Sequence, residues 1–201
     1  MPQTEPDIRV ACVTDLDLVP PEAPYALSAP QEDDEGDETP NSKEQTKSPP
    51  TPAERAAALK CNDGGPLRTF VSPQWTLEYD LAATDLAPLV WEAVVVGAKQ
   101  KSRAKNRKPP LSTAERQLAG AAAAKKLQSL AAAAAGSKAK LAASIYEPLY
   151  DKKASKAEVA ELLAELLDGD IRTPEQLREA VPKYLVDAID YVTRKPENPA
   201  P

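Results

Sequence analysis

The sequence predicts an α/β fold in which a small parallel sheet with helices is followed by an Ala-rich α-helical region. Two short apolar segments, residues 8–14 and 67–72, have the composition of strands, and a capped helical segment lies between them. From residue 76 onward, apolar residues recur at helical spacing. Strand, helix and strand in that order predict a parallel pair joined by a right-handed crossover.

The first strand and the segment after it differ sharply in composition. Residues 8–14 contain the apolar run VACV, which is typical of a buried strand with apolar side chains on both faces. Residues 19–50 are rich in Pro and acidic residues, and residues 31–47 alone carry seven acids and two lysines. Such a composition buries too little apolar surface to fold, so we expect a disordered insertion with a short ordered piece near Tyr25.

Capping residues and prolines delimit the expected helices. Thr51 and Glu54 fit a capping box that starts a helix ending near Lys60. The segment that begins at residue 76 predicts a short helix and a longer one, separated near Pro88. Further helices are expected from Ser112 with Glu115 to about Ala135, around residues 138–148, from Ser155 with Glu158, from Thr173 with Gln176, and after Pro182.

Composition excludes several kinds of chemistry. The chain has 201 residues, a net charge of −6, two cysteines and no histidine. Ser-His-Asp and Cys-His mechanisms are therefore excluded, and a structural zinc site lacks its ligands. Any metal must bind oxygen ligands, which favours Mg²⁺ or Mn²⁺. With no secretory signal and no apolar run of roughly 20 residues, we expect a cytoplasmic protein with reduced thiols and no membrane partner.

Oxygen-bearing side chains follow both predicted strands. Asp15 and Asp17 come directly after the first strand, and alternation along an extended chain would point both the same way. Thr76 and Glu78 follow the second strand, and parallel topology brings them to the same sheet edge. Two close carboxylates raise each other's pKa unless a cation lies between them. The four residues therefore predict a Mg²⁺ or Mn²⁺ site, while two solvated turn acids and a helix N-cap are the alternative.

The segments VTDLDLVP and FVSPQWTLEYDLA together resemble the carboxyl-terminal half of a Toprim domain. More specifically, they are similar to the OLD (overcoming lysogenization defect) family of ATP-dependent endonucleases. In that family the D-x-D pair and the Ser/Thr-x-Glu of a T/S-L-E-Y-D-L-A motif bind divalent metals. The resemblance thus assigns metal binding to Asp15, Asp17, Thr76 and Glu78. It also implies a catalytic role for Lys156, although Ala157 follows where the family usually has Gly.

What the resemblance implies is a metal-dependent DNA endonuclease or nickase, a hydrolase that cleaves phosphodiesters with two metal ions. Two parts of such an enzyme have no counterpart in this sequence. Toprim domains use glutamates on an earlier strand, and only fourteen residues precede Asp15. The P-loop of the ATPase domain, G-x-x-x-x-G-K-[ST], does not occur. We expect an N-terminally truncated chain with an incomplete site, and an ATPase domain supplied upstream or by another chain.

A basic stretch offers a surface for DNA. Residues 99–108 carry six basic residues and no acid. They lie at the carboxyl end of a predicted helix, where cations are favoured in any case. Such a row of cations also suits a phosphate backbone, and we favour non-specific DNA contact. The residues concerned are Lys99, Lys101, Arg103, Lys105, Arg107 and Lys108.

The sequence divides into a partial Toprim-like domain over residues 1–105, a helical region over 106–195, and a disordered tail over 196–201. Two other functions stay open. A haloacid-dehalogenase-like phosphatase would use Asp15 as nucleophile and Asp17 as acid/base, but the later strand with paired acids that this fold needs is missing. A non-catalytic helical interaction module, left from a truncated enzyme, would share the fold and lack turnover.

Overall fold

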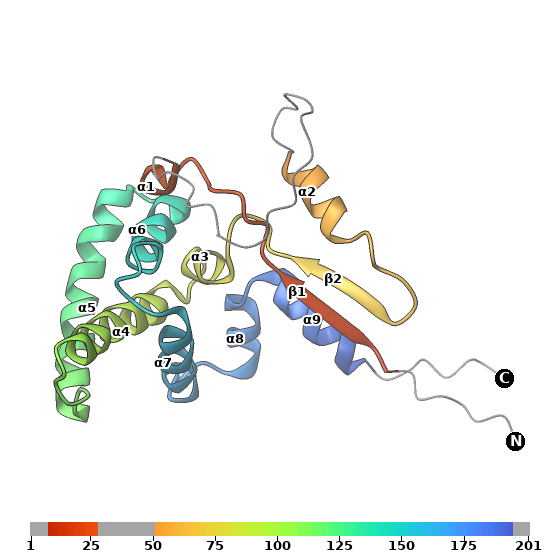
Figure 1. The fold of residues 1–201 in the computed structure, drawn as a ribbon. Coiled ribbons are helices and arrows are strands. Elements are labelled where there is room, and N and C mark those ends of the chain that lie inside the picture. The colour runs from red at the N-terminus through yellow and green to blue at the C-terminus, as the bar shows by residue number, and fades with distance from the viewer. Residues whose placement is uncertain (1–7, 28–50, 195–201) are drawn as a thin grey trace, which may run out of the picture.

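A computed structural model describes residues 8–27 and 51–194, and the expected tail over 196–201 lies outside them. A small sheet lies beside a larger group of helices (Figure 1). In chain order the elements are β1 (Val10–Thr14), α1 (Pro24–Leu27), α2 (Pro52–Leu59), β2 (Leu67–Val71), α3 (Leu77–Ala82), α4 (Ala87–Lys105), α5 (Thr113–Ala134), α6 (Lys138–Tyr150), α7 (Lys156–Asp168), α8 (Pro174–Ala180) and α9 (Lys183–Thr193).

The two predicted strands pair in parallel, which confirms the mixed α/β class. Val10 lies beside Leu67, and the register continues to the end of both strands. Helix α2 lies between them in sequence and begins with the predicted capping box. The Thr51 N–H donates to the Glu54 carboxylate at 2.8 Å, and the Glu54 N–H donates back to Thr51 at 3.3 Å. These two bonds satisfy backbone donors that the first helical turn leaves open.

The expectation that the first strand is buried on both faces is wrong. Val10 and Val13 are 47% and 45% exposed, and Cys12 is also exposed. Helix α9 packs on both strands, and its Tyr191 ring lies 5.9 Å from the Phe70 ring. A parallel strand is buried only where helices cover both faces and strands flank it on both sides. Within the described residues the sheet has two strands, so each strand keeps an outer edge.

The hydrophobic core lies among the helices. Helix α4 packs against α5, α6 and α7, and α3 packs against α6. Leu86, Val94 and Ile145 are fully buried there. The Trp75 ring meets the Tyr146 ring edge-on, with ring centroids 4.6 Å apart. Because Trp75 comes just before α3, this aromatic contact fixes the segment that carries the predicted site to the helical core.

Part of the insertion predicted to be disordered is well packed. Residues 28–50 lie outside the described residues, but residues 19–27 contribute to the core. Ala23 is fully buried, and the Tyr25 hydroxyl donates to the Ala143 carbonyl at 2.8 Å. The short ordered piece expected near Tyr25 is therefore present, because small side chains and one aromatic ring suffice to fill a site on the helical layer, even beside several prolines.

The helical second half largely follows the sequence signals. Ser112 and Thr173 form capping boxes with Glu115 and Gln176, as expected. Ser155 stands at the N-cap of α7, but its side chain makes no capping bond, so that predicted box is absent. Within the described ranges, no helix has both the length and the apolarity needed to cross a membrane.

Truncating one core leucine tests where the core lies. Leu86 is fully buried, whereas Leu118 is 72% exposed. The Leu86→Ala change should lower the free energy of unfolding by about 2–5 kcal/mol, because it leaves a cavity. The matched Leu118→Ala change should cost less than about 0.5 kcal/mol. Urea unfolding followed by circular dichroism measures both, and equal losses would contradict this location of the core.

Candidate metal and nucleic-acid site

The residues that follow the two strands meet where β1 ends and α3 begins. Asp15 Oδ1 accepts a hydrogen bond at 2.9 Å from the N–H of Leu77, the first residue of α3. The N–H of Asp17 donates to the Trp75 carbonyl at 3.2 Å. Because β1 and β2 are parallel, the residues that follow each strand lie at the same edge of the sheet. The contact predicted between the two sequence motifs is therefore present.

Thr76 caps α3, as the alternative interpretation of this residue expected. Its side-chain oxygen accepts from the Tyr79 N–H at 3.4 Å, and the residue is 4% exposed. The Asp15 carboxylate accepts from a second amide of the same helix N-terminus, that of Leu77. A helix N-terminus leaves such amides unpaired, and a carboxylate is a favourable partner for them.

Asp17 does not follow the alternation expected of it. Its φ is 56°, in the left-handed region, so the chain leaves the extended conformation at this residue. Asp17 is exposed, whereas Asp15 is half-buried. Burial raises the pKa of Asp15, the Leu77 amide opposes this shift, and the Glu78 carboxylate adds to it. The two aspartates thus share a turn and occupy different environments.

Lys156 lies against a predicted metal ligand. Its Nζ is 3.2 Å from Glu78 Oε2 and 5.6 Å from the centroid of the Tyr146 ring. Burial alone would lower the pKa of Lys156, but Tyr146 and Glu78 outweigh it, so the pKa is raised. Lys156 is therefore an ammonium ion paired with Glu78. The two residues come from α7 and α3, so the fold brings together two residues that are far apart in the sequence.

Asp80 belongs to the same cluster, although it was not among the residues predicted from the sequence. It is 4% exposed, and its Oδ2 accepts from the Ser72 hydroxyl at 2.6 Å. Among the described residues its Oδ1 has no hydrogen-bond partner. Burial raises the pKa of Asp80 to about 6; the Ser72 hydroxyl opposes this shift, and the Asp15 carboxylate adds to it. The one sequence signal for it is an acid placed between Tyr79 and Leu81 on a core-facing helix.

We refer to Asp15, Glu78 and Asp80 as the carboxylate cluster. Tyr184 of α9 approaches it, since burial and all three carboxylates raise the pKa of the Tyr184 hydroxyl. That hydroxyl is buried and has no hydrogen-bond partner among the described residues. The cluster therefore combines acidic groups from β1 and α3 with a phenol from the last helix.

The side chains of the cluster are of the type that binds a divalent cation, but they are too few to complete its coordination. Carboxylate oxygens are the ligands that Mg²⁺ prefers, and Asp80 Oδ1 is a buried oxygen that accepts no hydrogen bond within the described part of the chain. However, Asp15 already accepts a hydrogen bond from the first amide of α3, and Glu78 is already paired with Lys156. Over residues 8–27 and 51–194, no group of three or more acidic or cysteine side chains is arranged to hold a metal ion. The residues present fit one part of a metal shell.

The basic stretch combines one structural residue with several exposed ones. The Arg103 guanidinium donates to the Pro109 carbonyl and pairs with Glu115, both at 2.7 Å, which ties α4 to the start of α5. Lys101 donates to the backbone carbonyl of Lys152, in the turn that leads into α7. The stretch therefore adjoins the turn that precedes Lys156. Five of its six basic side chains are exposed: Lys99, Lys101, Lys105, Arg107 and Lys108.

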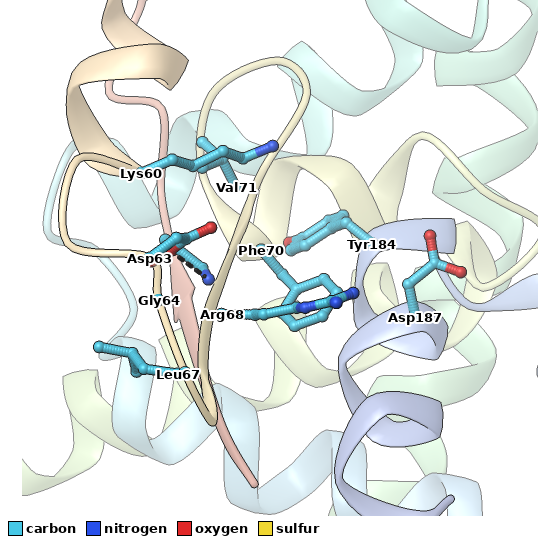
Figure 2. A pocket seen from close by; sticks show the side chains of 11 residues that line it. Lys60, Asp63, Gly64, Leu67, Arg68, Phe70, Val71, Tyr184 and Asp187 are labelled. Atoms are coloured by element: carbon cyan, nitrogen blue, oxygen red, sulfur yellow. Dashed lines mark hydrogen bonds between the residues drawn. The ribbon is translucent and has the colours of Figure 1, made fainter. Parts of the chain in front are cut away.

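A pocket of about 670 Å³ opens at a different place, on the outer edge of β2 (Figure 2). Lys60 and Arg68 line it together with Asp63 and Asp187, so its charges are mixed. Tyr184 lines it too, but none of the three clustered carboxylates does. Acidic groups from β1 and α3 converge at the cluster, where burial raises the pKa of Asp15 and of Asp80, and we therefore take the cluster as the candidate site.

Comparison with known proteins gives no match: no family model, no curated protein and no solved structure is similar to this chain. The resemblance to the OLD family therefore rests on the two sequence motifs alone.

Replacing Asp80 with Asn should flatten the pH dependence of stability. The folded-state pKa of Asp80 is about 6, above its ordinary 3.8, so the folded chain holds this proton more tightly than the unfolded chain. Stability contributed by the protonated group is thus present below about pH 4 and is lost as the pH rises through about 6. The difference between the folded and the ordinary pKa of Asp80 corresponds to a change of at most roughly 3 kcal/mol in the free energy of unfolding.

Urea unfolding at several pH values between about 4 and 7 measures this effect. Relative to the wild type, Asp80→Asn should gain stability steadily from the lowest to the highest pH. Asp85→Asn is the matched control, because the Asp85 side chain is 77% exposed. Parallel curves for the wild type and Asp80→Asn would show that Asp80 titrates normally and would contradict its raised pKa.

Proposed function

We propose that this chain carries part of the active site of a Toprim-type, metal-dependent DNA endonuclease of the OLD family. The observation that supports it most is the meeting of Asp15, Glu78 and Lys156. Nothing in the spacing of these residues requires the start of α7 to approach α3, yet the Lys156 ammonium and the Glu78 carboxylate form an ion pair. A metal site with an adjacent cation is the arrangement that phosphodiester cleavage needs.

Each residue of the cluster has a chemical role in this proposal. Asp15 and Glu78 would hold a Mg²⁺ or Mn²⁺ ion, with Asp17 and Thr76 as further oxygen donors. The bound ion would polarise the phosphodiester and lower the pKa of the attacking water. Lys156 neutralises Glu78 in the metal-free chain, and beside a phosphate its ammonium would stabilise the charge that develops during cleavage.

The basic end of α4 would bind the DNA backbone. Lys101 contacts the turn that precedes Lys156, so exposed cations continue from this turn along the end of α4. Contacts from lysine and arginine to phosphates position a duplex without reading its sequence. Arg103 would contribute less than its neighbours, because Glu115 and Pro109 already occupy its guanidinium.

Because the cluster has too few metal ligands, we expect this chain to cleave DNA slowly or not at all. Two-metal cleavage requires enough oxygen ligands to fix two ions near one phosphate, and the described cluster does not supply them. The same shortage supports the alternative, a non-catalytic module that keeps the fold. The phosphatase alternative has no such support, since its later strand would fall at residues 166–171, where helix α7 ends.

Metal binding should be weak and should compete with Lys156. Because the ammonium occupies Glu78, the Lys156→Met change should strengthen Mn²⁺ binding by about two- to fivefold, as expected for losing a partly exposed ion pair. Asp15→Asn keeps an acceptor for the Leu77 amide and should abolish binding. Water-proton relaxation in Mn²⁺ titrations measures the Mn²⁺ affinity of the wild type, Lys156→Met and Asp15→Asn.

Lys153→Met is the matched control for this titration. Lys153 lies three residues earlier and pairs with Asp151, away from the carboxylate cluster. Its replacement should leave the Mn²⁺ affinity unchanged. Equal affinities for the wild type, Asp15→Asn and Lys156→Met would place any bound metal elsewhere and rule out this site.

A plasmid-nicking assay with Mn²⁺ tests turnover directly. The wild-type chain should nick weakly or not at all, because its site lacks ligands for a second ion. Activity that appears when the chain is extended upstream would support the proposal. Robust nicking by the chain alone that is lost in Asp15→Ala, but retained in Asp85→Ala, would show that the site is already sufficient.

A further inference from the structure

Strand β1 has one unpaired edge. The Val10 N–H donates to the Pro66 carbonyl, and the Ser72 N–H donates to the Thr14 carbonyl, which fixes the pattern of the parallel ladder. In this pattern alternate residues turn their backbone groups toward opposite sides of the strand. The N–H and C=O groups of Ala11 and Val13 thus point away from β2. Among the described residues these four groups have no hydrogen-bond partner.

The outer edge of β2 differs, because the chain itself occupies it. Gly64 and Leu67 exchange two backbone hydrogen bonds, at 3.0 and 3.1 Å. The Thr69 N–H donates to Asp63 Oδ1 at 2.8 Å, and Asp63 lies over this edge in Figure 2. A side chain that takes an edge amide prevents a further strand from pairing there. Within the described ranges, the β1 edge alone is therefore open to another strand along its length.

Apolar side chains surround the open edge. Ile8 is 66% exposed, and Val10 and Val13 on β1 are nearly half exposed. An exposed apolar strand with free backbone groups is a site for pairing with another chain. Its two faces also alternate as a strand requires, with Val13 on the side of α9 and Val10 on the other.

Helix α9 packs on both strands and has exposed apolar side chains of its own. Its Asp187 faces the pocket at the β2 edge (Figure 2). Ile189 and Val192 lie about 200° and 140° further round the helix, since each residue turns it by about 100°. These two side chains, 55% and 45% exposed, are therefore on the flank away from the β2 edge. The apolar surface at the open edge is therefore that of β1 itself, with Ile8, Val10 and Val13.

We propose that this surface binds a second copy of the chain, with the two β1 strands pairing antiparallel in a four-stranded sheet. The register is centred on Cys12. It sets Ala11 opposite the partner's Val13, so the outward N–H and C=O groups of both residues bond across the two-fold axis. The N–H and C=O of each residue would then be satisfied without any change in the existing β1–β2 ladder.

The same register is complementary in charge. Residues opposite each other have numbers that sum to 24, so Arg9 stands opposite the partner's Asp15, on one face of the sheet. Opposite charges in such cross-strand positions stabilise the pair, and symmetry makes the contact twice. A register centred on Ala11 or Val13 would separate these charges. The dimer does not depend on the nuclease function proposed above, and in it Arg9 of the partner would compete with a metal ion for Asp15.

Cys12 provides a direct test of the register. At a non-hydrogen-bonded antiparallel pair the Cα atoms lie about 4.5 Å apart, within the range of about 4.4–6.8 Å seen in disulfides. The two cysteines, Cys12 and Cys61, are both exposed and free. In air with copper-phenanthroline, the two Cys12 thiols of a dimer would join in a disulfide. Oxygen would accept the two electrons and two protons that the thiols lose. On a non-reducing denaturing gel, Cys61→Ser should crosslink rapidly to a covalent dimer, and Cys12→Ser should remain largely uncrosslinked.

Sedimentation velocity under reducing conditions tests the non-covalent dimer. Val13→Lys places a charge at the edge and should weaken dimerisation at least tenfold, with an unchanged circular dichroism spectrum. Arg9→Glu should weaken it similarly. Arg68→Glu is the matched control, because Arg68 and Arg9 both lie over the Tyr191 ring, at 4.8 and 5.8 Å, and Arg68 belongs to β2.

Three results would overturn the inference. These are a wild-type chain that stays monomeric at high micromolar concentration, a dimer that Val13→Lys leaves intact, and crosslinking that proceeds through Cys61 as fast as through Cys12. The second and third would assign the interface to another surface of the chain.

Discussion

The hydrogen bond from the Leu77 amide to Asp15 joins the two halves of this molecule. It connects the end of β1 to the first turn of α3, and α3 packs in turn on α6. The sheet has only two strands among the described residues and cannot bury its own faces. Its orientation therefore depends on this link, on α9 beneath it, and on the Trp75–Tyr146 contact. The carboxylate cluster exists because that link draws acids from β1 and α3 together.

The cluster gathers more negative charge than its surroundings neutralise. Lys156 is paired with Glu78, while Asp15 and Asp80 both have raised pKa values. Holding unpaired carboxylates in a buried place costs free energy that folding alone does not require. In the function proposed above, a bound cation would offset this cost by coordination. The ion pair with Lys156 keeps one carboxylate neutralised when no metal is bound.

Local signals in the sequence predicted most of the fold. Capping boxes at Thr51, Ser112 and Thr173, and the strand–helix–strand order, indicated the elements and the parallel pairing. The exposure of β1 was mispredicted, since an apolar run does not reveal whether other elements will cover it. The ordered piece near Tyr25 was expected, but the full burial of Ala23 beside it was not, because burial depends on a surface formed by distant helices.

The candidate site was predicted in its outline and missed in its details. Asp15, Glu78 and Lys156 were selected from the sequence, but no local pattern tells that Lys156 contacts Glu78. Asp80 was passed over because an acid in a first helical turn usually serves the helix end. Its burial and its bond to Ser72 are properties of the folded chain only.

The central claim is that Asp15 and Glu78 share one cation. Anomalous diffraction from a crystal grown with Mn²⁺ tests it most directly. We expect a peak between these two carboxylates, with Lys156 displaced from Glu78. A crystal with Mn²⁺ bound at other carboxylates, and the Lys156–Glu78 ion pair intact, would contradict the claim.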